Sequence, residues 1–397
     1  MSQPTITSEE LADADGRRSR LRRRDWGFLG VLLALVVLFL ADWRGAYQAD
    51  LAVFSYDFKG LDWLFLYAVV VLAFYFVVPL AVNRDRTRAY WRRLRADRWA
   101  TASFFVLVGF TLIGLFGPFF FHPDQPVFGE AGPYGVPITQ PPVGFGIFRG
   151  GVCAGAQIDG FCHGTWKYPL GTTVGGKDVV GMIVAGARVA VQISAICVAL
   201  IVPLATAVGT TAATYGGRVD EFLMRYVDFQ QSVPAFFVII LAQEAVAFTQ
   251  GNTGGSLLLV VLVFGLMNWG GVARIIRSEA LELKEQPYVR AAESAGASKF
   301  AIVRKHIVPN TFNAIFTALT VQIAWLLLLE TTLSYLGIGS KIHASWGYVM
   351  TTSARADFFP TYHWWGVVFP TIALAAVVIS LQVLGDALRD VTDPRSE

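Results

Sequence analysis

Residues 189–213 read V-A-V-Q-I-S-A-I-C-V-A-L-I-V-P-L-A-T-A-V-G-T-T-A-A, without a single charged side chain. A helix needs about 20 apolar residues to cross a hydrocarbon core of about 30 Å, so this stretch is long enough to span a membrane. Every backbone N–H and C=O must be satisfied within the segment, because the bilayer core holds no water, and this favours a helix. A barrel would instead show alternating segments of about ten residues. The stretch therefore predicts an all-α integral membrane protein.

Seven further apolar runs repeat this pattern along the 397-residue chain. They lie at about 26–43, 61–82, 99–121, 229–248, 255–276, 311–334 and 364–386. The composition agrees, since 54 % of the residues are hydrophobic and only 15 % are charged, far from the averages of soluble domains. Eight transmembrane helices are therefore expected, and a cytosolic enzyme is excluded.

Positive charge orients these spans, because Lys and Arg are retained in cytoplasmic loops. With the N-terminus inside, 24 of the 32 Lys and Arg residues fall in inner segments, 7 fall in outer segments, and Arg188 lies at a boundary. Both termini of this multi-pass cell-membrane protein are therefore expected in the cytoplasm. The seven Arg of residues 84–98 could form a polybasic patch for nucleic acid or lipid, but charge that sets topology is the preferred interpretation. The net charge of +3 is too small to argue for a nucleic-acid partner.

The longest loop, about 122–178, faces outward in this orientation and carries Cys153 and Cys162. Two cysteines so close together on the oxidising side could close a small disulfide loop, and free thiols are the open alternative. Zinc ligation with His122 and His163 is disfavoured, since no Cys-x-x-Cys spacing is present. No metal site is therefore expected.

One segment of this loop imitates a phosphate-binding loop. Residues 171–177 read G-T-T-V-G-G-K, but Asp178 stands where a Ser or Thr would bind Mg²⁺, and no strand precedes the glycines. The sequence also lacks G-x-S-x-G, H-E-x-x-H and any Ser, His and Asp arrangement at a plausible spacing. We therefore expect no catalytic residue and no directly bound cofactor.

The inner loop 274–310 is too long and too well patterned for a simple connector. Pro287 can occupy the first turn of a short helix, and Gly296 permits the positive φ that ends it. Ser298 can then cap a second helix. The apolar positions of that helix are Phe300, Val303 and Ile307, which repeat at helical spacing up to Pro309.

Two short helices and a glycine turn thus predict an elbow, which we define as residues 287–309. Such an elbow between two spans would present small side chains that a partner protein can approach closely. The charged residues that flank these small side chains are Arg290, Glu293, Arg304 and Lys305.

Polar residues are few inside the predicted spans, and two of them fall in the span 311–334. Gln322 and Glu330 are eight positions apart, so they share one face of a helix that rises about 1.5 Å per residue. Intramembrane polar groups tend to face the bundle interior or a water-filled path, so the pair could line a route for a zwitterionic solute. The alternatives are an interhelical hydrogen bond for Gln322 and an interfacial position for Glu330.

The elbow resembles the EAA loop of binding-protein-dependent ABC importer permeases, with the letters of that motif in shifted order. The matching residues are Ala291, Ala292, Glu293, Gly296 and Ile307-Val308-Pro309. Further segments are similar to motifs of the dipeptide, oligopeptide and nickel branch of this family. They are Tyr168-Pro-Leu-Gly-Thr172, Gly176-Lys-Asp178, Gly186-Ala-Arg188, Thr214-Tyr-Gly-Gly217 with Asp220, Arg225 and Asp228, Leu333–Gly339 and Ser345-Trp-Gly347.

The C-terminal segment carries the resemblance further. Gly385–Asp390 followed by Asp393-Pro-Arg395 is similar to the ending of the C-type permease subunit of that branch. The chain departs from the family at Thr173, where Asp is usual, and at Lys177, where Arg is usual. The resemblance covers residues 99–397, and it implies a six-helix core of the ABC type I importer permease fold.

Residues 1–98 lie outside this core and would supply a basic tail, two additional transmembrane helices and a basic linker. The resemblance implies a permease subunit for dipeptides, oligopeptides or a related small solute such as a nickel chelate, and not an enzyme. Its implied partners are a second homologous permease, an extracytoplasmic substrate-binding protein and two cytoplasmic ATPase subunits that carry ATP and Mg²⁺. The implied ATPase-coupling residues are Arg290, Ala291, Ala292, Glu293, Gly296, Lys305 and Pro309.

Two other classes of function are alternatives to the importer. A self-contained channel or ion-coupled secondary transporter would require charged rings or a pore signature. An integral membrane enzyme would require an inner cluster rich in His or Asp. Neither pattern is evident in the sequence, so the importer permease is the preferred interpretation.

Overall fold

The computed structural model describes residues 8–45, 60–121, 139–148, 153–250, 257–338, 344–354 and 363–392. The chain divides into two compact units, Met1–Ala89 and Tyr90–Glu397. Within the described residues, seven helical segments are long and apolar enough to cross a membrane, and a bent pair of helices between residues 217 and 246 would add an eighth.

The N-terminal unit is a pair of long helical segments. Its elements are α1 (Ser8–Gly45), α2 (Gly60–Leu72), the π-helical turn η1 (Ala73–Val77) and α3 (Val78–Val82). The Trp63 indole donates a hydrogen bond to the Asp42 carboxylate at 3.0 Å, and the Phe28 ring meets Tyr75 edge-on at 5.1 Å. These contacts join α1 to the second segment, and both spans fall where the sequence predicts them.

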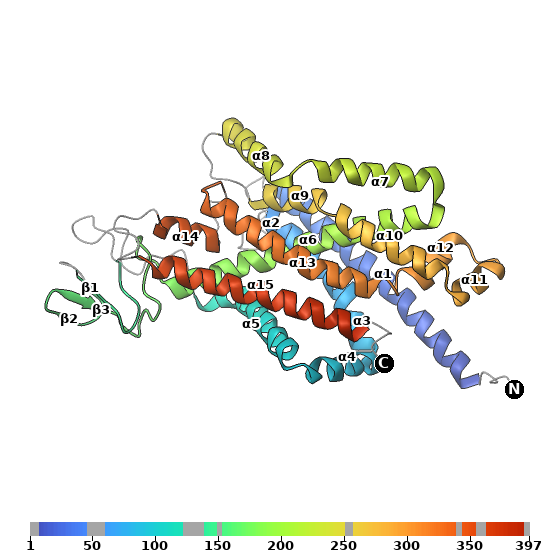
Figure 1. The fold of residues 1–397 in the computed structure, drawn as a ribbon, viewed down its shortest axis with the longest axis horizontal. Coiled ribbons are helices and arrows are strands. Elements are labelled where there is room, and N and C mark those ends of the chain that lie inside the picture. The colour runs from blue at the N-terminus through green and yellow to red at the C-terminus, as the bar shows by residue number, and fades with distance from the viewer. Residues whose placement is uncertain are drawn as a thin grey trace. The chain divides into compact units, whose positions relative to one another are not determined.

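Helix α4 (Arg84–Ala96) runs from the first unit into the second, which is a helical bundle (Figure 1). The long helices of the bundle are α5 (Arg98–Phe120), α6 (Val179–Tyr215), α7 (Gly217–Ser232), α8 (Ala235–Gln250), α9 (Leu257–Met267), α10 (Gly270–Lys284), α13 (Phe312–Tyr335) and α15 (Trp365–Thr392). Its short elements are α11 (Pro287–Ser294), α12 (Lys299–Ile302), the π-helical turn η2 (Val303–Ile307) and α14 (Trp346–Ala354).

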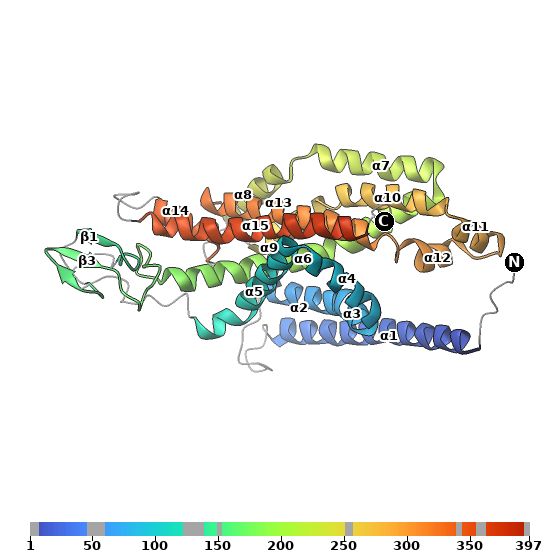
Figure 2. The same ribbon diagram turned by 60° about the horizontal axis from the view of Figure 1, so that its bottom comes forward.

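Helix α6 forms the centre of the bundle. It packs against α5 and α10, while α13 packs against α15, and these helices run side by side in Figures 1 and 2. The two short helices α11 and α12 lie at one end of the bundle, and a small sheet lies at the other.

Helix α6 is longer than the apolar run that predicted it. The Asp178 side chain accepts a hydrogen bond from the Val180 N–H, so the helix begins at Val179 instead of position 189. It ends where Gly216 takes a φ of +61°. Arg188, expected at a boundary, lies inside this helix.

The prediction of one continuous helix at 229–248 is wrong. Helix α7 ends at Ser232, and α8 starts at Ala235 with its axis turned by 64°. The break falls at Pro234, which has no N–H for the helical ladder and disfavours a helical conformation at Val233.

Two further boundaries differ from the sequence-based expectation. The expected span 255–276 is divided into α9 and α10 at Asn268, and α10 continues to Lys284, so the inner loop is shorter than 274–310. Helix α14 was not expected, because it falls within the segment 335–363 that was assigned to an outer loop. Its side chains Trp346, Val349 and Met350 are buried.

The fold class is all-α, with one small addition that the sequence analysis missed. Three short antiparallel strands, β1 (Gly146–Phe148), β2 (Gln157–Ile158) and β3 (Phe161–His163), form a sheet in the order β1-β3-β2. The turn between β2 and β3 has positive φ at both Asp159 (+50°) and Gly160 (+82°), as a two-residue hairpin of type I′ requires.

Close helix contacts account for several motif glycines. A Cβ at Gly186 would lie 2.2 Å from the Trp346 ring, one at Gly347 would lie 2.2 Å from the Thr331 carbonyl oxygen, and one at Gly385 would lie 2.1 Å from the Thr320 hydroxyl. Small residues are typical of membrane helix interfaces, because they let backbones approach and pack. These glycines therefore fix the spacing of α6, α13, α14 and α15.

Candidate functional site

The elbow begins directly after α10, where the backbone turns away from that helix. Gln286 is extended (φ −67°, ψ 138°), and Pro287 occupies the first turn of α11 as predicted. Val289 is the buried residue of α11. The Arg290 guanidinium forms an exposed ion pair with the Glu285 carboxylate, which joins α11 to the end of α10 but contributes little stability at so exposed a position.

Gly296 forms the turn between the two helices, as the sequence predicts. Its φ is +82°, its N–H donates to the Glu293 carbonyl at 2.9 Å, and the Ala297 N–H donates to the Ala292 carbonyl at 3.1 Å. This pair of bonds is the Schellman pattern, in which the residue after the helix cap is left-handed. The turn thus satisfies the last carbonyls of α11 and sets the angle at which α12 leaves.

The second half of the elbow is a short α-helix followed by a π-helical turn. The Ser298 hydroxyl accepts a bond from the Ala301 N–H at 3.3 Å and caps α12. Further on, the Val308 N–H donates to the Val303 carbonyl, five residues back. This wider turn places Ile302 and Ile307 together in the core.

The expectation that Phe300, Val303 and Ile307 form one buried face is therefore wrong in part. Ile307 is buried and Val303 is half-buried, but Phe300 is 74 % exposed. The π-helical turn changes the helical phase, so Ile302 takes the inward position in place of Phe300.

The elbow is anchored to the ends of α6 and α10. Val289, Ile302 and Ile307 pack in one apolar cluster with Ala213 of α6 and Ala280 of α10.

Two lysines, Lys284 at the end of α10 and Lys299 in the elbow, contact the end of α6. The Lys284 ammonium donates to the Ala213 carbonyl at 2.8 Å, and the Lys299 ammonium lies 5.1 Å from the centre of the Tyr215 ring. A cation at a helix C-terminus is favourable, because the last carbonyls carry partial negative charge. Lys299 therefore ties the elbow to the end of α6, and Lys284 ties the end of α10 to the same place.

Most of the predicted coupling residues are accessible to solvent. Ala292 is half-buried, and the others are exposed: Arg290, Ala291, Glu293, Gly296, Lys305 and Pro309. A Cβ at Gly296 would meet no atom within 4 Å, so the elbow's tip is sterically open. Phe300 is exposed on the elbow as well, which was not expected because its apolar side chain indicated burial.

A polar and aromatic cluster closes the base of the elbow and was also missed. The Asn310 amide donates to the His306 carbonyl at 2.6 Å and lies 3.5 Å from the Tyr288 hydroxyl. The Tyr288 and His306 rings are 5.9 Å apart between centroids. Tyr288 lies 22 residues before Asn310, so no local pattern could have revealed that it meets the second half of the elbow.

Gln322 and Glu330 both lie on α13 but have different neighbours. The Gln322 amide donates to the Asn268 carbonyl at 3.4 Å, across to the junction of α9 and α10. Glu330 is buried, and its carboxylate accepts a bond from the Ser334 hydroxyl at 2.7 Å. Within this single chain both side chains make structural contacts, and a role in the transport path stays a prediction.

The opposite end of the bundle is capped by residues of the long predicted outer loop. A disulfide joins Cys153 and Cys162, which is the pairing that the sequence left open. His163 is in β3, and His122 lies outside the described residues.

A buried cluster attaches this cap to the membrane helices. Ile147 and Cys162 of the sheet pack with Val179 of α6 and Trp365 of α15, and the Trp365 indole donates to the Thr172 carbonyl at 2.9 Å. This arrangement positions the cap against the start of both helices.

The family positions at the start of α6 are occupied by a tight turn. The Thr173 N–H donates to the Lys177 carbonyl at 2.8 Å, so the two residues that depart from the family pattern face each other across the turn. Burial raises the pKa of the Asp178 carboxyl, although hydrogen bonds from the Val180 and Gly181 N–H groups oppose that rise. Asp178 therefore acts here as a helix cap.

The chain is similar in sequence to known permease proteins. The chain is 32 % identical over 227 residues to the oligopeptide transport system permease protein OppC of Bacillus subtilis, which covers 57 % of this chain and 71 % of that protein. The sequence profile of the binding-protein-dependent transport system inner membrane component family matches residues 201–397, which include the whole elbow. The chain belongs to this family. It is a multi-pass membrane protein and a permease subunit of an ABC importer.

Other comparisons extend the match toward the N-terminus. The profile of the N-terminal transmembrane domain of oligopeptide transport permease C matches residues 86–142. The dipeptide transport system permease protein DppC of Bacillus subtilis is 28 % identical over 313 residues, which are 78 % of this chain and 86 % of that protein. OppC of Haemophilus influenzae is 28 % identical over 228 residues, 57 % of this chain and 70 % of that protein. Residues 1–85 precede both matched profiles.

Proposed function

We propose that this permease imports dipeptides, oligopeptides or a related small solute, and that its elbow receives the motion of an ATPase subunit. The elbow carries this proposal, because it is an exposed structure whose apolar core packs against two long helices, α6 and α10. Alternating access requires such stiff elements, since a flexible linker would absorb the motion. The relatives named as dipeptide and oligopeptide permeases support the class of solute.

We infer that the permease itself catalyses no reaction and binds no cofactor. In this proposal, two cytoplasmic ATPase subunits bind ATP and Mg²⁺ and supply the energy. A second, homologous permease completes the membrane pathway, and an extracytoplasmic binding protein delivers the solute. The orientation that fits has both termini and the elbow in the cytoplasm of the cell, with the disulfide-bonded cap outside.

Charge reversal at the elbow tests this proposal. Glu293→Arg should weaken co-purification of the ATPase subunits by on the order of tenfold and lower peptide uptake, because it reverses one interfacial charge. Glu282→Arg is the matched control, since Glu282 is exposed on α10 outside the elbow. If both variants retain the ATPase subunits and uptake at the wild-type level, the elbow does not couple the two proteins through this charge.

A further inference from the structure

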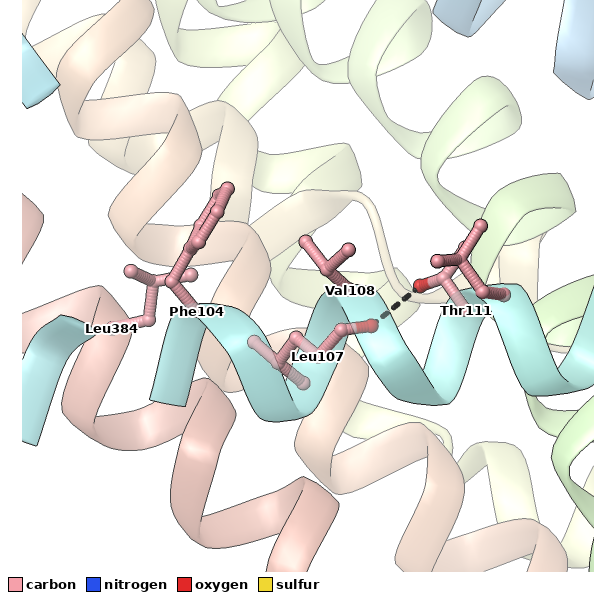
Figure 3. A pocket seen from close by; sticks show the side chains of 6 residues that line it. Phe104, Leu107, Val108, Thr111 and Leu384 are labelled. Atoms are coloured by element: carbon pink, nitrogen blue, oxygen red, sulfur yellow. Dashed lines mark hydrogen bonds between the residues drawn. The ribbon is translucent and has the colours of Figure 1, made fainter. Parts of the chain in front are cut away.

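An apolar groove opens between α5 and α15 (Figure 3). It has a volume of about 260 Å³ and is lined by Phe104, Leu107, Val108, Thr111, Leu112 and Leu384. The Thr111 hydroxyl donates to the Leu107 carbonyl of its own helix at 2.8 Å. The only hydroxyl in the groove is thus satisfied internally, and the groove suits a hydrocarbon chain.

Basic residues lie beyond one end of this groove. Arg92, Arg95 and Arg98 are exposed on α4 and at the start of α5, and no ion pair is formed by them among the described residues. Arg98 precedes Phe104 by about 9 Å and Leu112 by about 21 Å along α5, at 1.5 Å per residue. A chain of lipid length can therefore follow the groove while its head group stays near the arginines.

Aromatic residues place these arginines at the membrane surface. Arg95 lies over the Trp91 ring at 4.8 Å, and Arg98 lies over the Trp99 ring at 5.6 Å. Trp99 is 67 % exposed at the start of a membrane span, a position typical of interfacial tryptophans. The head-group region of the bilayer therefore falls at the level of the arginines.

The α4 end of the groove is fixed relative to α5 and α15. Leu94 and Ala100 pack against Leu384, with Trp91 and Phe104 at the edge of the cluster. Helix α4, which carries Arg92 and Arg95, is therefore held beside the end of the groove. The end of α5 that adjoins α4 and the elbow helices α11 and α12 lie toward the same end of the bundle (Figures 1 and 2).

We propose that this site binds one anionic phospholipid, with its phosphate at Arg92, Arg95 and Arg98 and one acyl chain in the groove between α5 and α15. Charge selects the anionic head group, since each basic residue near a membrane surface favours acidic lipid by about 1 kcal/mol, or about fivefold. The basic segment thus has a binding role in addition to setting topology. In the proposed orientation, the lipid comes from the cytoplasmic leaflet.

A photoreactive lipid tests the site directly. The full-length permease would be reconstituted in nanodiscs that contain a trace of phosphatidylglycerol with a diazirine on one acyl chain, and labelled peptides would be mapped by mass spectrometry. Labelling is expected on residues 104–112 and around Leu384, and unlabelled phosphatidylglycerol should compete. A phosphatidylcholine probe with the same acyl chains should label these peptides much less.

Variants separate the head-group and acyl-chain contacts. Arg95→Gln with Arg98→Gln should require roughly 25-fold more phosphatidylglycerol for half-maximal labelling. The control Arg218→Gln with Arg225→Gln removes equal charge from α7 and should change the requirement less than about twofold. Val108→Trp should fill the groove and abolish labelling, whereas Ile372→Trp at an exposed site of α15 should not.

Each contrary result overturns the proposal. Equal labelling by the two lipids would show only general contact with the bilayer. If neither lipid probe labels the peptides that line the groove, the groove is not accessible to lipid. Labelling that persists in Val108→Trp, with an unchanged thermal transition, would place the acyl chain elsewhere.

Discussion

Gly296 is the residue on which the geometry of the elbow depends. Its φ of +82° is sterically costly for a β-branched side chain, although a Cβ would meet no neighbour. Gly296→Val should insert normally but lose co-purification of the ATPase subunits and solute uptake, because the turn changes at a cost of about 1–3 kcal/mol. Gly296→Asn is the control, since Asn tolerates a left-handed conformation and should retain most of both activities. If Gly296→Val takes up solute at the wild-type rate, the elbow is not the element that couples the ATPase subunits to transport.

Substitutions of glycines in the helix interfaces should act through steric clashes and not through backbone conformation, because a side chain at these positions has no space. At Gly347 an added Cβ would lie 2.2 Å from a backbone oxygen, so Gly347→Ala should lower the free energy of unfolding by about 1–3 kcal/mol. Gly109→Ala is the matched control in α5, because its Cβ would meet nothing within 4 Å. Thermal unfolding of both variants in detergent measures the difference, and equal transition temperatures would contradict the predicted close contact.

Single residues also show what sequence can reveal. Pro287, Gly296 and Ser298 were predictable, because each has a local conformational role that needs no knowledge of its neighbours. Asp159-Gly160 carried an equally local hairpin signal, but the all-α expectation left it unused. Phe300 could not be placed from its periodicity, since a π-helical turn that begins three residues later shifts the pattern.

Among the elements, α7 is held against α10 by ion pairs as well as by the buried Val227 side chain beside Gly270. The Arg277 guanidinium donates two hydrogen bonds to the Asp220 carboxylate, and Arg274 pairs with Asp228 on the same side. Asp220→Asn should weaken the half-buried pair and destabilise the α7–α10 contact by about 1–3 kcal/mol.

A charge swap separates this pairing from other roles of the two residues. Asp220→Arg alone and Arg277→Asp alone should each lower the thermal stability, because each places two like charges side by side. The double variant restores an opposite-charge pair and should recover part of that loss. A double-mutant cycle on the purified permease gives the coupling energy, and additivity of the two changes would contradict the pairing.

The boundaries of elements were predictable only where the signal lay in the chain itself. The capping residue Asp178 and the helix-breaking Pro234 stood in the sequence, although hydropathy alone overlooked both. Helix α14 carried no such signal, because its burial depends on Gly186, Thr331 and other residues distant in sequence. Pairings such as Lys284 with Ala213 likewise appear only once the helices are assembled.

For the whole molecule, the distribution of charge predicts which end of the bundle faces the cytoplasm. A cysteine at Lys299 in the elbow should resist an impermeant thiol reagent in intact cells, whereas one at Gly175 in the outer cap should react. As a control, both cysteines should react with the reagent once the cells are permeabilised, which shows that both positions are accessible. If the impermeant reagent labels the Lys299→Cys variant in intact cells, the elbow faces outward and the predicted orientation is wrong.

Helix α6 has one further consequence for the transport cycle. Its first turn packs against the disulfide-bonded cap, and its last turn contacts the elbow through Ala213 and Tyr215. If the binding protein docks on the cap and an ATPase subunit docks on the elbow, α6 connects the two docking sites, and we expect the two binding events to be energetically coupled. Linkage is reciprocal: the factor by which the loaded binding protein tightens ATPase attachment must equal the factor by which the attached ATPase tightens retention of the binding protein.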